Sequence, residues 1–398
     1  MLIQSKKELV ICGDLKPDDV FFYYTTTGWM MWNFLVSGLT VGCTLVLYDG
    51  SPLRDPAYLW NLTDELGITI FGTSAKYIDH LSKVYVPRDK HLLRSLRQIY
   101  STGSPLAPAL YDYVYESIHP KVLLGSITGG SDICSLFAGM CTALPVYRGE
   151  IQCRMLGMAV ESYTPTGTVN EPGEAGELVC TQPFPCMPLG FWPLPGYGEG
   201  EAEAAAQARF QQSYFPDGSS VWYHGDHVAV TRSRAGNGGG MIMLGRSDGV
   251  LNPGGIRFGS SEIYDVIDTC FSASTASADQ TIIECLAVGQ PIDMGTDERV
   301  LLFVKLLDGH VLSQELESKI KAEIRARRTP RHVPARIVQV SDVPYTLNGK
   351  RVEVPIKKII NGAAIASVNP ATLRNPECLL EYTELGKALR AEVEKVPQ

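Results

Sequence analysis

The stretch that runs from Ile68-Thr69-Ile70-Phe71 to Ser101-Thr102-Gly103-Ser104-Pro105 decides the fold class of this chain. It begins with a short β-branched run and continues through a helical segment from Ser74 to Val84. A second apolar run, Leu96 to Tyr100, then leads into the small-residue loop. A strand, a helix and a strand in this order predict a parallel βαβ unit. Ligands of such sheets gather at the carboxyl ends of the strands, where we expect this loop to lie.

The same alternation extends to both sides of this stretch. A β-branched run from Gly42 to Tyr48 precedes it, and a helical segment from Leu110 to Ile118 follows it. The next short run, Val122 to Leu124, ends at a second small-residue loop that reaches Asp132. Residues 40 to 130 therefore predict a layer of parallel βαβ units.

Two different patterns follow this layer. From about residue 150 to 245, glycine, proline and short β runs favour an antiparallel, barrel-like subdomain, in which Pro193 to Gln212 is typical of a surface insertion. Later, Leu316, Ile320 and Ile324 repeat at helical spacing and predict an amphipathic helix. That helix fits a short α+β domain from about Gly249 to Ile360, with a polar tail after it.

Composition narrows the class of protein. A formal net charge of -8 over 398 residues argues against a nucleic-acid binder, which would normally show a basic face. The ten cysteines stand singly, without a CxxC pair, so we expect buried thiols in a reducing cytosol rather than a zinc site or a disulfide framework. The start of the chain shows no signal peptide, and its most apolar run, Phe34 to Tyr48, is too short to span a bilayer. The oligomeric state is left open.

Individual motifs allow more than one interpretation. The carboxylate of Asp226, which follows Tyr223-His224-Gly225 at the entrance of a strand, could accept both hydroxyls of a ribose or simply form a turn. Arg246 has planar donors that suit a ribose or a phosphate, and alone it would be a surface arginine. Asn348-Gly349 favours a tight turn that holds Lys350 away from the backbone, where it could meet a developing negative charge or remain solvated.

Eight such motifs stand in order along the chain. They are Gly28-Trp29-Met30-Met31-Trp32, Ser101 to Leu106, Thr128-Gly129-Gly130-Ser131-Asp132, Gly176 to Val179, Trp222 to Asp226, Gly245 to Gly249, Gly255-Ile256-Arg257 and Pro344 to Lys350. Over nearly the whole chain they resemble the successive core motifs of the adenylate-forming superfamily of acyl-CoA synthetases. Three stretches, Tyr24–Asn33, Leu47–Pro52 and Gly245–Tyr264, are similar to the acetoacetyl-CoA synthetases within that superfamily.

The resemblance implies a two-domain adenylate-forming fold of the α/β and α+β classes. Residues 1–246 would form the C-terminal part of the large AMP-binding domain, with a β-rich subdomain from about residue 150. Residues 247–360 would form a small, mobile C-terminal lid domain, and residues 361–398 a C-terminal tail.

It also implies a set of nucleotide-binding residues, which are Gly103, Ser104, Pro105, Asp226, Arg246 and Arg257. Residues 103–105 would lie against the adenine, and Asp226, assisted by Arg246, would hold the ribose hydroxyls. Ser131 would touch the α-phosphate and Asp132 would help to bind Mg²⁺. Most of the superfamily has Thr-Glu at these two positions. The shorter Asp would bring the metal closer to its loop or reach it through water.

The remaining roles concern catalysis and coenzyme A. Lys350 would bridge the substrate carboxylate and the α-phosphate during in-line attack, as a charge stabiliser and not as a nucleophile. Asp248 would be the hinge of the C-terminal domain, and Gly254 and Gly255 would approach CoA after the domain turns. The arginines between residues 325 and 331 would meet CoA phosphates or form a solvated helix face.

The resemblance further implies an acyl pocket, whose residues are Trp29, Met30, Met31, Thr102 and Gly129. Acetyl-CoA synthetases close this pocket with a tryptophan where this chain has Gly129, and removing an indole would admit a longer acid. Methionine is an adaptable wall for such a pocket. The alternative is that Gly129 only eases a tight turn beside Gly130, and both explanations stay open.

The activity implied is ATP-dependent ligation of acetoacetate to CoA through an acetoacetyl-adenylate, with ketone-body use for lipid synthesis. The superfamily also carries a Ser/Thr/Gly-rich phosphate loop that nothing between Met1 and Thr27 resembles. Met1 to Val20 resemble the helix after that loop, so we expect about the first half of the large domain to be absent and nearby strand edges to be unpaired. A non-catalytic binding or regulatory product, or a ligase for another small carboxylic acid, are the alternatives.

Overall fold

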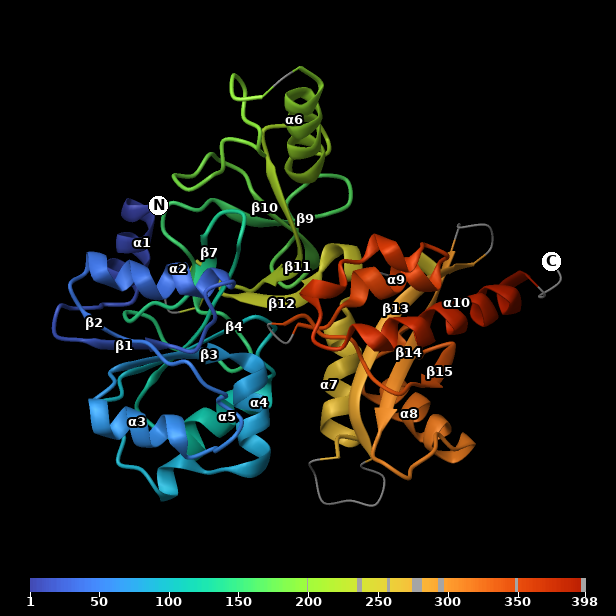
Figure 1. Cartoon of the computed structure of the whole chain (residues 1–398), viewed down its shortest axis with the longest axis horizontal. Coiled ribbons are helices and arrows are strands. Elements are labelled where there is room, and N and C mark those ends of the chain that lie inside the picture. Colours follow the sequence, from blue (N-terminus) through green and yellow to red (C-terminus); the bar gives the residue numbers. More distant parts are fainter. Residues whose placement is uncertain are drawn as a thin grey trace. The chain divides into compact units, whose positions relative to one another are not determined.

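The computed structural model describes residues 1–198, 200–234, 238–255, 258–273, 281–292, 297–347 and 350–394. The chain forms two compact units, Met1–Met243 (unit 1) and Leu244–Gln398 (unit 2), each built of helices and strands (Figure 1). Among the described residues, no helix is both long enough and apolar enough to cross a bilayer.

Unit 1 contains a five-stranded sheet with the strand order β2-β1-β3-β4-β5 (Figure 1). Its strands are β1 (Val20–Tyr23), β2 (Thr44–Val46), β3 (Ile70–Ser74), β4 (Gln98–Thr102) and β5 (Leu123–Ser126). The helices that connect them are α2 (Met30–Val36), α3 (Tyr58–Leu66), α4 (Ala75–Val84) and α5 (Pro108–Tyr113). All four neighbouring pairs are parallel, which confirms the βαβ layer predicted for residues 40 to 130.

Helix α4 shows why these elements were readable from the sequence. It starts where the Ser74 hydroxyl accepts a hydrogen bond from the backbone N–H of Tyr77 at 3.1 Å, a typical N-cap. Its buried residues Tyr77, Ile78 and Leu81 then lie on one face, with Lys83 in the last turn. The N-cap residue, the apolar face and the charged last turn of this helix therefore all fall within one short stretch of sequence.

The two faces of this sheet pack into two different cores. Successive side chains of a strand point to opposite faces, so Phe21 and Phe22 of β1 enter different clusters. The cluster of Phe22 and Phe71 also takes residues from α3, α4 and α5, and the ring of Trp60 on α3 stacks on Phe71 with centroids 4.7 Å apart. The opposite cluster joins the sheet to α2 and to the antiparallel strands, among them that of Phe137.

The remainder of unit 1 is antiparallel, as predicted, although it begins earlier than residue 150. One sheet has the order β6-β7-β8, with β6 (Thr128–Gly130), β7 (Ser135–Gly139) and β8 (Cys153–Arg154). The other has the order β12-β11-β10-β9, with β9 (Val160–Tyr163), β10 (Ala175–Cys180), β11 (Trp222–Val230) and β12 (Met241–Arg246), the last of which runs into unit 2.

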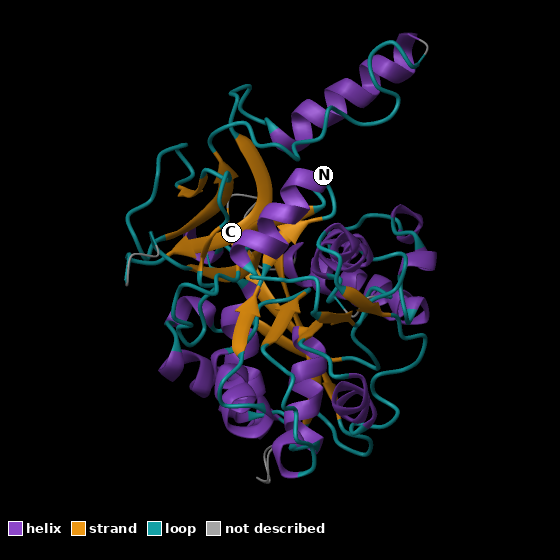
Figure 2. Cartoon of the chain, turned by 90° about the vertical axis from the view of Figure 1, so that its left-hand side faces the viewer, coloured by secondary structure: helices purple, strands orange, loops and turns teal. Residues whose placement is uncertain are grey.

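Helix α6 (Gly200–Tyr214) lies at the top of both views (Figure 1; Figure 2). It falls in the segment expected as a surface insertion, and it is anchored on one face. Tyr214 stacks on Trp222 of β11 with ring centroids 3.8 Å apart, and Phe210 packs against the same indole at 6.2 Å. The insertion therefore contributes side chains to the core of unit 1.

The start of the chain is helical for a shorter distance than predicted. Helix α1 (Leu2–Lys6) continues as a π-helix, Lys7–Cys12, which ends before Gly13, and β1 begins at Val20. The predicted helix extends to Val20, so the sequence does not predict β1. Strand β1 is paired on both sides, by β2 and β3, so the edges of the parallel sheet are β2 and β5 among the described residues.

Unit 2 contains a three-stranded sheet with the order β13-β14-β15 between two layers of helices. The strands are β13 (Ile282–Ile292), β14 (Asp297–Leu306) and β15 (Arg336–Gln339). Helices α7 (Ser260–Cys270) and α8 (Gln314–Arg327) pack on one face, and α9 (Glu353–Ile360) and α10 (Leu379–Glu394) on the other. Helix α8 buries Ile320 and Ile324, which confirms its predicted amphipathic pattern.

The segment after Ile360 differs from the expected polar tail. Tyr382 on α10 is fully buried, and Leu379 and Leu389 are 2% and 3% exposed. All three belong to the same core cluster as Phe303 of β14. Residues 361–394 are therefore part of unit 2, while the other predicted domain limits stay predictions.

Candidate active site

In unit 1, the carboxyl ends of the parallel strands carry several of the predicted residues. Thr102 ends β4, and its hydroxyl donates to the carbonyl of Ile127, just beyond β5, at 2.9 Å. Gly103 follows with a φ of +94°, a conformation that favours glycine. A methyl group on Gly103 would lie 3.5 Å from the ring of Trp29, so the expected adenine loop and one expected wall of the acyl pocket are neighbours.

The other residues of these two sets are placed differently. Ser104 and Pro105 are exposed in the loop after β4. Met30 and Met31 open helix α2, and Met31 is only 2% exposed within the core. Met31 therefore packs against protein side chains in this structure, and its role in an acyl pocket remains a prediction.

Ser131 and Asp132 lie in the turn between β6 and β7. Both side chains are exposed, and the turn ends at Cys134, which has a φ of +47°. A short hairpin turn holds both side chains close to the ends of rigid strands. This placement suits groups that must meet a phosphate and its metal ion.

Gly129 lies at an irregularity in the pairing of β6 with β7. A methyl group there would fall 2.0 Å from the carbonyl oxygen of Ser135 and 2.8 Å from the Cα of Leu136. Those are backbone atoms, which cannot turn aside as a side chain can. The structure therefore favours the packing explanation for Gly129, and a tryptophan substitution would disturb the hairpin before it could report on an acyl pocket.

Strand β11 places Asp226, the residue predicted to bind the ribose hydroxyls, next to this hairpin. His224 and Asp226 are 6% and 7% exposed, and His224 Nε2 lies 3.8 Å from Asp226 Oδ2. A methyl group on Gly130 would fall 2.4 Å from the ring of His224, so β6 packs directly on that imidazole. Trp222 Nε1, on the same strand, donates a hydrogen bond to His224 Nδ1 at 3.4 Å.

His224 was assigned no role in the sequence, although it stands inside the Trp222–Asp226 motif. The signal that could have found it is the period of two along β11, which places alternate residues on one face. Sequence reasoning also missed Glu177, whose Oε1 accepts the backbone N–H of Gly225 at 2.9 Å and so holds the strand next to Asp226.

Behind the Ser131–Asp132 turn lies a buried carboxyl group. Glu8 is 1% exposed, and its Oε1 accepts hydrogen bonds from the Ser135 hydroxyl and, at 3.0 Å, from the Leu136 backbone N–H. Gln4 Nε2 donates to the Ser135 hydroxyl at 2.8 Å. Burial raises the pKa of Glu8, although the charge of Lys7 and these hydrogen bonds act in the opposite direction. The first helical turns thus pin β7 directly after the turn.

In unit 2, Lys350 is exposed at the end of a narrow loop. Its backbone N–H donates to the Thr346 hydroxyl at 3.0 Å, and its carbonyl accepts from the Thr346 N–H at 2.9 Å. Tyr345 and Arg351 form an antiparallel bridge at the base of the loop. The predicted Asn348-Gly349 turn lies outside the described residues.

Two predicted residues, the hinge Asp248 and Arg246, which is predicted to assist in binding ribose, lie at the beginning of unit 2. Arg246 is exposed at the end of β12 and precedes a 3-10 turn, Ser247–Gly249, which contains Asp248. A methyl group on Gly249 would fall 2.8 Å from Glu353 Oε2, so this turn packs against the start of α9.

The predicted CoA-contacting glycines follow in a second 3-10 turn, Pro253–Gly255. Gly254 has a φ of +61°, and its backbone N–H donates to Asp297 Oδ1 at 2.6 Å. A methyl group on it would fall 2.0 Å from the guanidinium of Arg331. Gly254 therefore allows a basic side chain to approach the backbone closely. Arg257 lies outside the described residues.

The expected residues thus fall into two groups. Unit 1 holds the expected adenine loop (residues 103–105), the turn of Ser131 and Asp132 (the phosphate turn) and Asp226. Unit 2 holds the loop that carries Lys350 (the lysine loop) and the expected hinge. The model of the family described as "AMP-binding enzyme" matches residues 2–192. Residues 2–192 include the expected adenine loop and the Ser131–Asp132 turn, so this part of the chain is similar to AMP-binding enzymes.

Similarity to individual members of the family extends over both units. The chain is 46% identical to the acetoacetyl-CoA synthetase of Danio rerio over 96% of its length and 53% of that protein. It is 40% identical to malonamoyl-CoA synthetase vrtB of Penicillium aethiopicum over 96% of its length and 51% of that protein.

Among solved structures, the acetoacetyl-CoA synthetase of Streptomyces lividans superposes with a TM-score of 0.84 at 37% identity, over 98% of this chain and 56% of that one. The chain therefore spans about half the length of the relatives it matches.

Proposed function

We propose that this AMP-binding protein ligates acetoacetate to coenzyme A in two steps. ATP and acetoacetate would give acetoacetyl-AMP and pyrophosphate, and CoA would then displace AMP to give acetoacetyl-CoA. The observation that carries the proposal is the similarity to acetoacetyl-CoA synthetases, which covers 96% of the chain and therefore includes the lysine loop as well as the strand-end loops.

The first step needs positive charge on oxygens that become more negative as the carboxylate attacks phosphorus. We assign that task to Lys350, because its ammonium group stands on a loop whose base is held by backbone hydrogen bonds. Ser131 would donate its hydroxyl hydrogen bond to the α-phosphate. Asp226, buried on β11, would accept the ribose hydroxyls and so set the position of the nucleotide.

The residues at the phosphate turn fit a magnesium ion. The described residues contain no group of three or more His, Cys, Asp or Glu side chains that could hold a metal by themselves. Mg²⁺ commonly takes one or two protein carboxylates together with substrate phosphates and water, so the single exposed carboxylate of Asp132 suits it. When bound, the ion would supply positive charge to the phosphates.

The role of Lys350 is tested by separating the two half-reactions. We expect Lys350→Ala to abolish acetoacetate-dependent ATP–pyrophosphate exchange, while thioester formation from supplied acetoacetyl-AMP and CoA stays within a few fold. Lys358→Ala, which removes an exposed lysine from α9, is the matched control and should leave both rates unchanged. Equal losses in both half-reactions would contradict the role assigned to Lys350.

The same assays decide between catalysis and binding alone. They should be run on the protein isolated from cells that make it and on the recombinant chain in parallel. A protein that binds AMP without supporting either half-reaction would favour the regulatory alternative. We also propose a cytosolic location, which is supported by the ten cysteines, all of them described and all free.

A ligase for malonamic acid is the second candidate, because of the 40% identity to malonamoyl-CoA synthetase. Malonamate has the shape of acetoacetate with an amide NH₂ in place of the terminal methyl group. A pocket built to hydrogen-bond that NH₂ would reject the methyl analogue by about 10⁴-fold or more, whereas an apolar pocket discriminates far less. Comparison of kcat/KM for the two acids therefore decides the chemistry of the pocket, and a strong preference for malonamate would overturn the acetoacetate proposal.

A further inference from the structure

The loop that carries Lys350 is held at its base by the segment that follows α9. The backbone N–H of Leu347 donates to the carbonyl of Thr372 at 3.0 Å, and the N–H of Arg374 donates to the carbonyl of Tyr345 at 2.8 Å. Thr346 and Leu373 form an antiparallel bridge between these two hydrogen bonds. Residues 372–374 thus lie against the loop as a third, strand-like segment.

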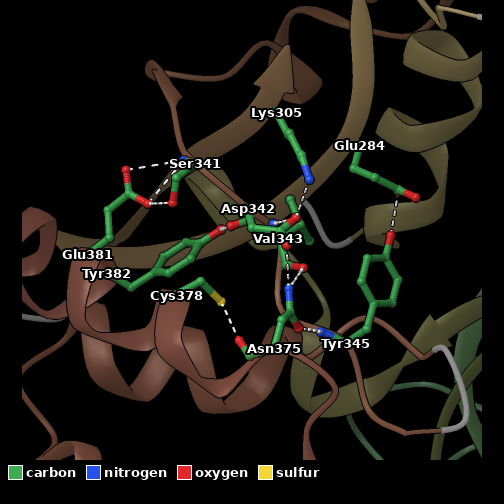
Figure 3. A network of polar contacts seen from close by, with 10 residues as sticks. All are labelled: Glu284, Lys305, Ser341, Asp342, Val343, Tyr345, Asn375, Cys378, Glu381 and Tyr382. Carbon is green, nitrogen blue, oxygen red and sulfur yellow. Dashed lines mark hydrogen bonds and ion pairs between the residues drawn. The ribbon is translucent and has the colours of Figure 1, made fainter. Parts of the chain in front are cut away.

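Asn375 completes this contact with its side chain (Figure 3). Its Oδ1 accepts the backbone N–H of Tyr345 at 3.0 Å. Its Nδ2 donates to Asp342 Oδ2 at 2.8 Å and to the carbonyl oxygen of Val343 at 2.9 Å. The acceptor end of the amide therefore meets a donor, and its donor end meets two acceptors.

The partners of Asn375 are themselves fixed to the sheet of unit 2. Lys305 on β14 donates to Asp342 Oδ1 at 2.8 Å, and Tyr382 on α10 donates to the Asp342 carbonyl at 3.1 Å. The hydroxyl of Tyr345 donates to Glu284 on β13 (Figure 3). Burial acts to raise the pKa of Asp342, but the hydrogen bonds and the charge of Lys305 lower it overall, so this carboxylate is ionised next to the amide.

We infer that Asn375 is a positioning residue for Lys350, an inference that rests on the proposed function. An amide is the side chain that can satisfy the donor at Tyr345 and the acceptors at Asp342 and Val343 together. By joining these three points it sets the register between residues 342–346 and 372–375, and with it the direction in which the loop leaves the sheet. Asn375 acts through the backbone of the loop and not through contact with substrate.

The test exchanges the amide for a group of nearly the same size. Asn375→Asp keeps an acceptor for Tyr345 but places a carboxylate opposite Asp342 and the Val343 carbonyl. Asn369→Asp is the matched control, because Asn369 lies on the same segment and uses its Oδ1 to accept the Ala371 N–H at 3.1 Å. We expect Asn375→Asp to lower acetoacetate-dependent ATP–pyrophosphate exchange by roughly tenfold to a hundredfold, because it removes a hydrogen bond to the charged carboxylate of Asp342. Thioester formation from supplied acetoacetyl-AMP should change by less than about threefold.

A second substitution distinguishes orientation of the loop from a general loss of structure. In the double variant Asn375→Asp with Asp342→Asn, the carboxylate and the amide exchange places and can again face each other. We expect partial rescue of the exchange rate relative to Asn375→Asp alone. Absence of rescue, or an equal loss in both half-reactions, would overturn the positioning role.

Hydrogen exchange provides a readout that does not depend on activity. The amides of Tyr345 and Leu347 should lose protection by about tenfold in Asn375→Asp, while Asn369→Asp leaves them unchanged. Unchanged protection in both variants would overturn the inference. If the parent protein shows no acetoacetate-dependent exchange but Asn375→Asp still deprotects the loop, the proposed function fails while the assignment of Asn375 to the loop stands.

Discussion

Replacing Tyr382 by alanine tests whether the last described helix is part of the core of unit 2. The side chain is fully buried, and its ring packs edge-on against Phe303 of β14 with centroids 5.0 Å apart. Its hydroxyl donates to the carbonyl of Asp342 at 3.1 Å. Removing the ring therefore leaves a cavity against β14 and an acceptor that has lost one donor.

The size of the effect follows from these two losses. Truncation of a buried aromatic side chain to alanine typically costs about 3–5 kcal/mol, because the cavity collapses only in part. Tyr382→Phe keeps the ring and removes only the hydroxyl, so we expect about 0.5–1.5 kcal/mol for that variant. The difference between the two variants is then the contribution of the ring to the packing of α10.

Hydrogen exchange followed by mass spectrometry is the suitable assay, because every tryptophan of the chain lies in unit 1 and fluorescence would report on the wrong unit. We expect the amides of β14 to lose protection by a hundredfold or more in Tyr382→Ala, since about 1.4 kcal/mol corresponds to tenfold. The amides of β3 and β4 in unit 1 serve as an internal reference.

The control is Leu380→Ala on the same helix, because Leu380 is 67% exposed. We expect that variant to change the protection of β14 by less than threefold, as is usual for surface substitutions within about 0.5 kcal/mol. If Tyr382→Ala deprotects β14 no more than Leu380→Ala does, α10 is not part of the core of unit 2 and the expected polar tail is the better description.

Two further predictions concern unit 1. Gly129→Ala should lower its stability to urea, followed by tryptophan fluorescence, by about 1–3 kcal/mol, since the new methyl group meets the Ser135 carbonyl at 2.0 Å. Gly28→Ala, where the nearest atom is 4.0 Å away, should stay within about 0.5 kcal/mol, and equal effects would refute the packing role of Gly129. Because burial raises the pKa of Glu8 above its ordinary 4.5, the folded state binds this proton more tightly than the unfolded state, and stability is lost as the pH rises through the folded pKa. The Tm of Glu8→Gln minus that of the parent should therefore become more positive from acidic to neutral pH, and a difference that does not vary with pH would contradict this.

Much of the fold was predictable because its signals are local. The helix from Ala75 to Val84 has its cap, its apolar face and its terminal charge within one short window. The strands of the parallel sheet were each found within a few residues of their limits, apart from β1. Strand β1 is only four residues long, which is too few to show a period of its own, and the predicted helix extends to its first residue, Val20.

The candidate site was predictable to the extent that its residues stand in short motifs. Gly103 follows β4, as its motif predicts, and lies beside Trp29, whereas Asp226 lies in the middle of β11 and not at the expected strand entrance. Spacing along the chain could not reveal that Gly130 packs on His224. Those two residues are brought together by strands that are far apart in the sequence.

The sequence by itself determined the parallel layer, the amphipathic helix that buries Ile320 and Ile324, and the order of the motifs, because hydrophobic period, turn chemistry and motif order all act over short distances. Only the tertiary structure decided that Gly129 is pressed against the backbone of β7, that α10 belongs to a core, and that Asn375 holds the lysine loop. Each of these depends on a contact between segments that the chain brings together only on folding. From the local sequence alone, Gly129 could equally have lined a pocket, α10 could have been a polar tail, and Asn375 could have been an exposed side chain.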